Sequence, residues 1–293
     1  MLNNFFKRNK IILFFFCLTS LQVFGRSQLF IPQKHKAKAP LLIALHGCLS
    51  SSEDIEEYSK FSDYGEQFGF FVFYPELKDT LDKSKCWDFY DVNSQKPGTG
   101  DAGDIMNAVA QIKKDYPIDD REVYVVGMSA GASLVNLIAS CYPDDIAGIA
   151  VHSGMAYGLP KTWQEATLIA QVGPFLLHPR NKSCNPKNYK GKVLIIHGSN
   201  DNIMNPLHYS QNLTDYFFGS KVKKSYVQPI NFKLGYIHDK FYRNNKLIGH
   251  GYLILGMAHQ WSGRPDILDP AIPLGPDASR LMVNYFFNGG NEM

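Results

Sequence analysis

The chain has 293 residues, which is enough for one large α/β domain or two small ones. It carries 30 basic and 27 acidic residues, for a net charge of +3, and no dense basic block with interleaved aromatic residues. This balance argues against a nucleic-acid-binding protein. Hydrophobic residues make up 45% of the chain, so a sizeable core can be buried.

The first 25 residues have the pattern of a secretory signal peptide. Three basic residues precede an apolar run of about 14 residues that ends at Phe24, and Val23 and Gly25 suit the −3 and −1 positions of a cleavage site. The alternative is a membrane anchor, but a spanning helix needs roughly 20 apolar residues. We therefore expect cleavage near Gly25, no stable membrane insertion of the mature chain, and a secreted or periplasmic location.

Cleavage would remove Cys17 and leave an even number of cysteines, which in an exported protein suggests two disulfides. The remaining residues are Cys48, Cys86, Cys141 and Cys184. Four cysteines allow three pairings, and their spacing does not choose among them. The sequence has no C-x-x-C motif and no pair of histidines at helical spacing, so neither a metal site nor a cofactor is expected.

Beyond residue 25, apolar runs of strand length alternate with helical segments. Residues 26–40 are a polar lead-in, 76–100 are loop-like, and 155–190 are expected to be an irregular excursion. Strands are predicted at 41–45, 70–74, 123–126, 146–151, 192–196, 232–237 and 247–255, the last two pairing around Asn244-Asn245. Helices are predicted at 51–68, 101–114, 132–140, 206–218 and 278–287. The alternation predicts an α/β fold with a mostly parallel sheet and helices on both faces, in one domain covering 26–293.

The stretch from Val123 to Val135, V-Y-V-V-G-M-S-A-G-A-S-L-V, contains the pentapeptide G-x-S-x-G. A β-rich apolar run precedes the pentapeptide and a helical segment follows it, which is the context of a nucleophile elbow. There Ser129 would occupy a strained turn with its hydroxyl above the sheet, and the two flanking glycines would let strand and helix approach closely. The alternative is a Gly-Ser turn between two core elements.

Functional groups of open α/β sheets collect at the carboxyl ends of the strands. Ser129, Asp201 and His259 each follow a predicted strand, in the chain order Ser, Asp, His that is expected of an α/β-hydrolase. A serine hydroxyl needs a base to remove its proton as it attacks. We therefore expect Ser129 to be the nucleophile, His259 its general base, and Asp201 the acid that orients the imidazole.

Other residues near strand ends are alternatives for two of these roles. His46, His197 and His250 are further candidates for the base, although the first two, each followed directly by glycine, could be structural histidines. Asp144 and Asp145 approach a strand from its wrong end, so Asp201 is preferred as the acid.

The expected oxyanion donors are two backbone N–H groups, those of Ala130 and Cys48. Ala130 directly follows the nucleophile, and Cys48 lies in the turn after the strand at 41–45. Trp87 and Trp261 lie close in sequence to the loops of the proposed site. We expect both rings to line the substrate pocket, with packing in the core as the alternative.

Several segments spread over the chain match the motifs of a known esterase family. They are Leu45-His46-Gly47-Cys48, Cys86-Trp87, Gly127-Met128-Ser129-Ala130-Gly131, Tyr142-Pro143-Asp144 leading to Ser153-Gly154, His197-Gly198 with Asp201, His259-Gln260-Trp261-Ser262-Gly263 and Gly275-Pro276-Asp277-Ala278-Ser279. On these segments the chain resembles the family of extracellular poly(3-hydroxybutyrate) depolymerases and feruloyl esterases. The resemblance implies an α/β-hydrolase fold, hydrolysis of carboxylic esters and the same triad. It also suggests Cys48–Cys86 as one disulfide, which would leave Cys141–Cys184 as the other.

The sequence departs from this family at three places near the proposed site. Leu49-Ser50 stands where the family often has a Thr-Gln pair, and Ala258 and Arg264 stand where glycines are usual. These changes leave the triad intact and alter the expected shape of the pocket. Polymer-degrading members often carry an extra substrate-binding domain, and the chain ends soon after the predicted closing helix. Adsorption to a solid polyester is therefore less expected than hydrolysis of soluble or oligomeric esters.

Two functions from different classes fit these observations. The first is a secreted serine esterase that acts through an acyl-enzyme on poly- or oligo(3-hydroxyalkanoate) esters, or alternatively a feruloyl or acetylxylan type of aryl or carbohydrate esterase. The second is a non-catalytic binding protein on the same fold, against which the presence of all three triad residue types argues. A peptidase would share the triad chemistry and differ in its leaving group. The sequence says nothing about oligomeric state.

Overall fold

The computed structural model describes residues 27–77, 86–175, 179–228, 234–264 and 275–288. The predicted signal peptide, including Cys17, lies outside the described residues. Among the helices described, none combines the length and the apolar character that crossing a membrane requires.

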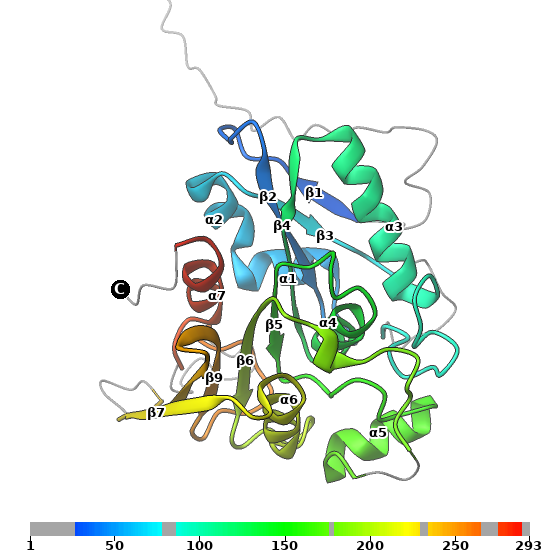
Figure 1. The fold of residues 1–293 in the computed structure, drawn as a ribbon, viewed down its shortest axis with the longest axis vertical. Helices are drawn as coiled ribbons and strands as arrows, with labels where there is room; N and C mark the ends of the chain where they lie inside the picture. The colour runs from blue at the N-terminus through cyan, green and yellow to red at the C-terminus, as the bar shows by residue number, and fades with distance from the viewer. Residues whose placement is uncertain (1–26, 78–85, 176–178, 229–233, 265–274, 289–293) are drawn as a thin grey trace, which may run out of the picture.

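A mixed sheet of nine described strands forms the centre of the fold, in the order β1-β3-β2-β4-β5-β6-β9-β8-β7 (Figure 1). The strands are β1 Gln28–Phe30, β2 Ala39–Leu45, β3 Phe71–Tyr74, β4 Ile118–Met128, β5 Gly148–His152, β6 Lys192–Gly198, β7 Lys221–Val227, β8 Tyr236–Arg243 and β9 Lys246–Ile254. The block from β3 to β9 in this order is parallel. The strands at the two edges are antiparallel to their neighbours.

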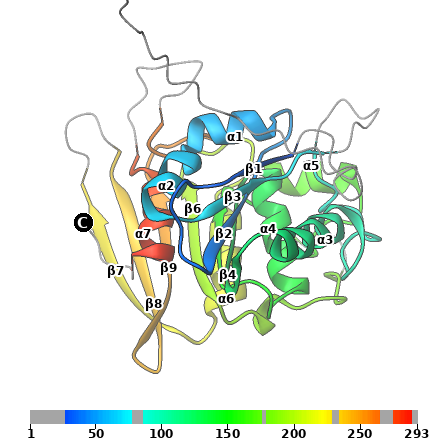
Figure 2. The ribbon, with the colours of Figure 1, turned by 90° about the horizontal axis from the view of Figure 1, so that it is seen from above.

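Helices cover both faces of this sheet, as Figure 2 shows with the sheet seen from above. The helices are α1 Ser52–Ser59, α2 Phe61–Phe68, α3 Gly100–Asp115, α4 Ala130–Cys141, α5 Trp163–Val172, α6 Leu207–Phe217 and α7 Ala278–Phe287, with a 3₁₀ turn η1 at Pro186–Asn188. Apolar residues of α3, α4, α5 and α6 share one core cluster, and those of α1, α2 and α7 share the other. The predicted mostly parallel α/β fold is confirmed.

The two core clusters follow from the two-residue period of the buried strands. In β2, Leu41 and Ile43 belong to the cluster under α3 and α4, whereas Leu42 and Ala44 belong to the cluster under α1, α2 and α7. Successive side chains of a strand point to opposite faces, so a strand covered on both sides must be apolar at every position. This is why the parallel strands read as continuous apolar runs.

The helix predicted at 51–68 is two helices. Lys60 adopts the left-handed conformation at φ 57°, ends α1 with its N–H on the carbonyl of Glu56, and directly precedes α2. The break changes the chain direction so that Phe61 enters the core, where it is fully buried. Helices commonly end at a residue in the left-handed conformation. The break at Lys60 is not visible in the sequence, because the helical pattern continues on both sides of it.

Strand β1, strand β7 and helix α5 are not anticipated by the sequence patterns. Strand β1 is three residues long at the sheet edge, and every residue of β7 is exposed, so neither shows the alternation of a half-buried strand. Helix α5 lies inside the segment expected to be irregular, where the side chain of Thr162 accepts the N–H of Glu165 and starts the helix.

The pairing predicted around Asn244-Asn245 is confirmed as the β8–β9 hairpin, but its first strand, β8, runs from residue 236 to 243 and not from 232 to 237, and residues 232 and 233 lie outside the described residues. Arg243 pairs with Lys246, so the loop has two residues, and both have positive φ, 49° at Asn244 and 62° at Asn245. Two central residues with positive φ are characteristic of the tight turn that suits the twist of a hairpin, and asparagine tolerates this conformation better than most residues.

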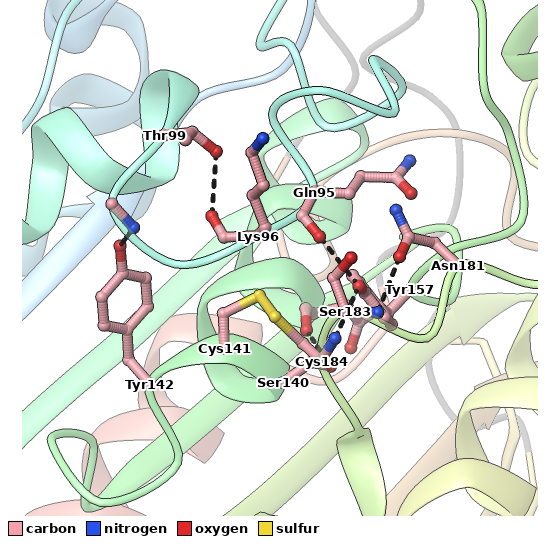
Figure 3. The surroundings of a disulfide bond; sticks show 12 residues. Gln95, Lys96, Thr99, Ser140, Cys141, Tyr142, Tyr157, Asn181, Ser183 and Cys184 are labelled. Carbon is pink, nitrogen blue, oxygen red and sulfur yellow. Dashed lines mark hydrogen bonds between the residues drawn. A yellow bond between two sulfur atoms is a disulfide. The ribbon is translucent and has the colours of Figure 1, made fainter.

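Two disulfides link segments that are distant in the chain. Cys48–Cys86 links the turn after β2 to the loop before α3, and Cys141–Cys184 links the end of α4 to the segment before η1 (Figure 3). Beside the second one, the hydroxyl of Tyr157 accepts the N–H of Cys184 at 3.1 Å. The pairing suggested by the family resemblance is confirmed. Each bond closes a loop of about 40 residues, for which chain entropy predicts about 4 kcal/mol of stabilisation.

Candidate active site

Ser129 lies in the turn between β4 and α4, where the strand–turn–helix pattern predicts it. Its backbone is at φ 57° and ψ −119°, a conformation that is costly for a residue with a side chain and that persists because its surroundings hold it. The N–H of Ser129 donates to the carbonyl of His152 at 2.9 Å, and its carbonyl accepts both the N–H and the hydroxyl of Ser133. The turn is therefore fixed from β5 on one side and from α4 on the other.

The two glycines of the pentapeptide have the packing role that the sequence predicts. A side chain at Gly127 would come 2.8 Å from the backbone nitrogen of Ala132, and one at Gly131 would overlap the carbonyl oxygens of Leu45 and His46. The first turn of α4 thus packs on the end of β2. Only glycine leaves room for this approach.

The turn that follows β2 lies directly beside the serine. A side chain on Gly47 would place its Cβ 3.4 Å from the Cβ of Ser129. Cys48 follows Gly47, and Ala130 is the first residue of α4, so the N–H of Ala130 has no acceptor within its own helix. Both expected oxyanion donors therefore belong to the backbone next to Ser129, and their role remains a prediction.

Asp201 and His259 are brought together at the ends of β6 and β9. His259 Nδ1 lies 2.8 Å from Asp201 Oδ2, and Oδ1 of the same carboxylate accepts the N–H groups of Ile203 and Met204 at 3.0 and 2.8 Å. The two loops are joined by backbone contacts as well, because the N–H of Asn200 donates to the carbonyl of Met257 at 3.0 Å. Backbone N–H groups of its own loop therefore position the Asp201 carboxylate. The loop that carries His259 is hydrogen-bonded to the loop that carries Asp201.

The environment of Asp201 keeps it ionised. Burial alone would raise the pKa of the Asp201 carboxyl, but the hydrogen bond and the charge of His259, with the N–H of Met204, bring it below its ordinary value. A carboxylate that accepts from Nδ1 fixes the proton there and leaves Nε2 of His259 free to act as a base. This is the arrangement that a general base beside a serine requires.

His152 is a component of the site that the sequence did not indicate. It is the last residue of β5 and is fully buried. Its Nε2 accepts the N–H of Ser262 at 3.2 Å, its ring stacks on Trp261 with centroids 5.1 Å apart, and its carbonyl holds the N–H of Ser129. Burial, followed by the charges of His197 and His259, lowers the pKa of His152 to about 3, so the ring is neutral. The Ser153-Gly154 motif that follows it was the only sequence signal nearby.

The other histidines considered as bases have structural partners. His46 is buried, with Nδ1 2.7 Å from the carbonyl of Gly47 and Nε2 3.3 Å from Glu76. His197 has Nε2 2.8 Å from the carbonyl of Met204 and 3.5 Å from Asp201, and burial lowers its pKa. His250 pairs with His238. Of these rings, that of His259 has the shortest distance to the Asp201 carboxylate.

The alternative acids lie elsewhere. Asp144 and Asp145 are exposed in the turn that leads into β5, at the edge of the sheet opposite Ser129. The structure places Asp201, and not these two residues, beside His259, and the role of Asp201 as the acid remains a prediction.

The side chains of Trp87 and Trp261 are buried beside the loops of the site. Trp87 is fully buried and its Nε1 donates to the carbonyl of His46 at 2.8 Å, so it supports the turn that carries Cys48. Trp261 is 4% exposed, and its Nε1 donates to the hydroxyl of Ser279 at 3.0 Å. As placed, both rings brace the loops around the site, and a role in lining the substrate pocket remains a prediction.

No group of three or more His, Cys, Asp or Glu side chains is placed to hold a metal ion in the part of the chain that the structure describes. Asp201, His197 and His259 lie close together, and the Asp201 carboxylate already contacts His259 Nδ1 at 2.8 Å and the N–H groups of Ile203 and Met204, while His197 Nε2 lies 2.8 Å from the carbonyl of Met204. The chemistry that this arrangement can perform is proton transfer and nucleophilic attack.

Comparison with known proteins identifies related sequences. Residues 27–218 match the family described as esterase PHB depolymerase. The chain is 29% identical over 258 residues to poly(3-hydroxyalkanoate) depolymerase C of Paucimonas lemoignei, covering 83% of this chain and 62% of the relative. It is 29% identical over 204 residues to the probable acetylxylan esterase A of Aspergillus clavatus, covering 64% of each. The chain thus spans about three fifths of the length of these relatives.

A further relative is feruloyl esterase B of Neurospora crassa, which is 32% identical over 135 residues, or 45% of this chain and 44% of the relative. Among solved structures, the acetyl xylan esterase from Aspergillus awamori superposes with a TM-score of 0.64 at 22% identity, covering 80% of this chain and 88% of that one. At this level of identity the superposition supports a shared fold.

Proposed function

The chain belongs to the esterase PHB depolymerase family, and we propose that it is a serine hydrolase that cleaves carboxylic esters through an acyl-enzyme. The observation that carries this proposal is the 2.8 Å contact between His259 Nδ1 and the buried carboxylate of Asp201, at the same sheet edge as the Ser129 elbow. The triad of Ser129, Asp201 and His259 assigned from the sequence is part of the proposal.

In this mechanism the hydroxyl oxygen of Ser129 attacks the ester carbonyl carbon while Nε2 of His259 takes the hydroxyl proton. Asp201 stabilises the imidazolium that forms. The N–H groups of Ala130 and Cys48 bind the negative oxygen of the tetrahedral intermediate. His259 then gives its proton to the leaving alcohol, and a water molecule activated in the same way releases the acid from Ser129.

The proposed substrates are poly- or oligo(3-hydroxyalkanoate) esters, in which the leaving alcohol is the hydroxyl end of the next unit. Similarity to poly(3-hydroxyalkanoate) depolymerase C over 83% of this chain supports this choice. The proposed location is outside the cytoplasm, secreted or periplasmic, and the two disulfides support it because such bonds persist in oxidising compartments.

A second candidate is an esterase of the acetylxylan or feruloyl type. It is favoured by similarity to acetylxylan esterase A and feruloyl esterase B, and by the fold shared with a solved acetyl xylan esterase. A non-catalytic binding protein is disfavoured, because the strained backbone of Ser129 and the buried Asp201–His259 pair serve no purpose that binding alone would need.

The test is hydrolysis of a panel of esters by the purified mature protein, its Ser129→Ala variant, and a Ser183→Ala control at an exposed serine. The panel holds short p-nitrophenyl esters, methyl ferulate, acetylated xylan and a 3-hydroxybutyrate oligomer. We expect activity in the parent and in Ser183→Ala, none in Ser129→Ala, and preference for the oligomer. Preference for ferulate or acetylated xylan would select the second candidate, and no ester activity in the parent would overturn the proposal.

A further inference from the structure

Strand β7 is an edge strand on which every residue is exposed, and all of its side chains except Ser225 are basic or apolar. Figure 2 shows β7 as the outermost strand of the sheet, with β8 between it and β9. Because β7 bonds to β8 on one side, the N–H and C=O groups of every second residue point away from β8. We call the surface formed by Lys221–Val227 together with Phe218 the β7 edge.

Basic side chains are concentrated at the β7 edge and in the two strands beside it. The first 25 residues hold three of the 30 basic residues and none of the 27 acidic ones, so residues 26–293 carry 27 of each. Residues 219–254 alone carry seven basic residues and one acidic residue, Asp239. This acid is 3% exposed and lies 3.5 Å from Nζ of Lys224. The exposed charged side chains described in this range are therefore all positive, namely Lys221, Lys223, Lys224, Arg243 and Lys246.

Two pairs of like charges face each other across these strands. Lys223 is opposite Lys240 in the register of β7 and β8, and Arg243 is opposite Lys246 where β8 turns into β9. Like charges directly opposite each other destabilise a sheet. A partner that carries many negative charges would relieve this repulsion, so the two pairs favour binding of an anionic surface or polymer.

Large apolar side chains are exposed among the lysines of the β7 edge. Phe218 is 74% exposed, Val222 54% and Tyr226 55%. Val222 and Tyr226 are four residues apart in the strand, so they lie on the same face of it. Nζ of Lys187 lies 5.6 Å from the centre of the Phe218 ring, so a further basic residue borders this apolar surface. A partner that matches the edge must therefore offer apolar groups as well as negative charge.

A lipid bilayer with anionic headgroups offers both. The headgroups attract lysine side chains near the surface, and the boundary between headgroups and acyl chains accommodates aromatic and aliphatic side chains. Phosphate oxygens can also accept the N–H groups that point outward from β7. An anionic polysaccharide would match the lysines but offers no apolar layer to Val222. A second copy of the chain, paired edge to edge, would bring the lysines of two strands together.

From the exposed lysines, the apolar side chains among them and the outward backbone of an edge strand, we propose that the β7 edge docks this protein on lipid bilayers with anionic headgroups. The contact is peripheral, because side chains of one strand enter the headgroup region and no helix crosses the bilayer. The proposal concerns a surface outside the triad and does not depend on the proposed esterase function.

The test is cosedimentation with vesicles of phosphatidylglycerol and with vesicles of phosphatidylcholine. All proteins carry Ser129→Ala, so that no lipid ester is cleaved during the measurement. We expect the parent to bind phosphatidylglycerol, to bind phosphatidylcholine weakly, and to be released at high salt. The variant Lys221→Gln/Lys223→Gln/Lys224→Gln should bind phosphatidylglycerol about 100-fold more weakly, at about fivefold for each lysine.

The matched control is Lys34→Gln/Lys36→Gln/Lys38→Gln, which removes the same charge from three exposed lysines between β1 and β2. It should bind the vesicles like the parent, and the melting temperatures of both triple variants verify that they are folded. Equal binding of the two triple variants would overturn the proposal, because net charge and not the β7 edge would then determine binding.

A third variant, Phe218→Gln/Tyr226→Gln, keeps every charge and removes two apolar side chains. We expect it to bind phosphatidylglycerol vesicles at least about fivefold more weakly than the parent. Parental binding by this variant would overturn a lipid surface as the partner, since charge alone would then account for the affinity. Retention of the parent by polygalacturonate but not by the vesicles would overturn the proposal as well, and so would a dimer in sedimentation that the β7 lysine variant abolishes.

Discussion

The backbone carbonyl of His152 accepts the N–H of Ser129 at 2.9 Å, so the last residue of β5 holds the nucleophile turn. The ring of the same histidine accepts the N–H of Ser262, three residues after His259, and stacks on Trp261, two residues after it. One buried, neutral residue therefore connects the loop of the proposed nucleophile with the loop of the proposed base. We infer that His152 sets the distance between them and acts as a positioning residue.

The variant His152→Phe tests this role, since it keeps a ring for stacking and removes the acceptor for Ser262. A buried N–H without an acceptor destabilises its loop by about 1–3 kcal/mol. Displacement of the base by a fraction of an ångström to an ångström lowers kcat by about 10- to 100-fold, with KM little changed. Steady-state kinetics on a soluble ester measure both constants.

His152→Gln is the matched variant, because its side-chain carbonyl can accept near the position of Nε2 and should recover part of kcat. His35→Phe, at an exposed histidine, is the control for the substitution itself. A His152→Phe enzyme with parental kcat would show that the Ser262 contact does not position the base.

Asp201→Asn tests the acid of the proposed triad. An asparagine keeps the size of the side chain and can present its N–H₂ to Nδ1 of His259, which would move the ring proton to Nε2 and remove the base. The expected fall in kcat is about 10⁴-fold, the loss seen when the acid of a serine triad is neutralised. Single-turnover hydrolysis of a p-nitrophenyl ester is sensitive enough to measure it.

The control for this change is Asp144→Asn, at an exposed carboxylate on the opposite edge of the sheet, which should retain full activity. If Asp201→Asn kept kcat within a few-fold of the parent, another group would have to orient His259, and Asp201 would be a structural carboxylate for the 201–204 turn.

How much of the structure can be predicted from the sequence depends on whether the residues that determine a feature are adjacent in the chain. The elbow at Ser129 is set by adjacent residues, a β-rich run, two glycines and a helix start, and all are visible in thirteen consecutive letters. Asp201 and His259 are distant in the chain, but both follow apolar strands, and parallel strands bring their carboxyl ends to one edge. Motif and topology together were sufficient to predict the pair now seen at 2.8 Å.

Residues whose role depends on non-local packing were not predictable. His152 gains its role from Ser262, 110 residues later, through the order of β5, β6 and β9 in the sheet. Strand β7, read as K-V-K-K-S-Y-V, is exposed along its whole length and forms only because β8 offers an edge. Helix α5 was not predicted because the segment before it is rich in glycine and proline, which is typical of a loop.

We expect removal of one disulfide to have different consequences from removal of the other. Replacing Cys141 and Cys184 by alanine should lower the free energy of unfolding by about 4 kcal/mol through loop entropy, with activity on a soluble ester unchanged. Replacing Cys48 and Cys86 should cost a similar amount and also lower kcat, because Cys48 belongs to the turn beside Ser129. Denaturant unfolding and ester kinetics on both double variants make the comparison.

Each double variant serves as the control for the other. Equal kcat in the two proteins would mean that the turn after β2 keeps its shape without the Cys48–Cys86 bond. In that case either the N–H of Cys48 would not be an oxyanion donor, or Trp87 alone would keep the turn in place. Trp87 can do so because its Nε1 donates to the carbonyl of His46.

From a half-buried pair of carboxyl groups, one in the loop before α3 and one in its first turn, we predict a pH dependence of stability. Asp88 accepts the N–H of Asp101 at 3.1 Å, Asp101 accepts the N–H of Asp88 at 2.8 Å, and the hydroxyl of Ser94 donates to Asp88 at 2.7 Å. Burial and then the charge of Asp88 raise the pKa of Asp101 to about 7. The folded chain therefore keeps a proton that the unfolded chain releases near pH 4.

Between about pH 4 and pH 7 the folded state binds more protons at this site than the unfolded state, so raising the pH through this window favours unfolding. Asp101→Asn removes the ionisation and keeps a carbonyl to accept the N–H of Asp88. Its melting temperature should match the parent near pH 4 and exceed it at pH 8. Asp115→Asn, at the exposed end of α3, is the control and should follow the parent at every pH. Parallel curves for Asp101→Asn and the parent from pH 4 to pH 8 would show that the two carboxyl groups share no proton in the folded state.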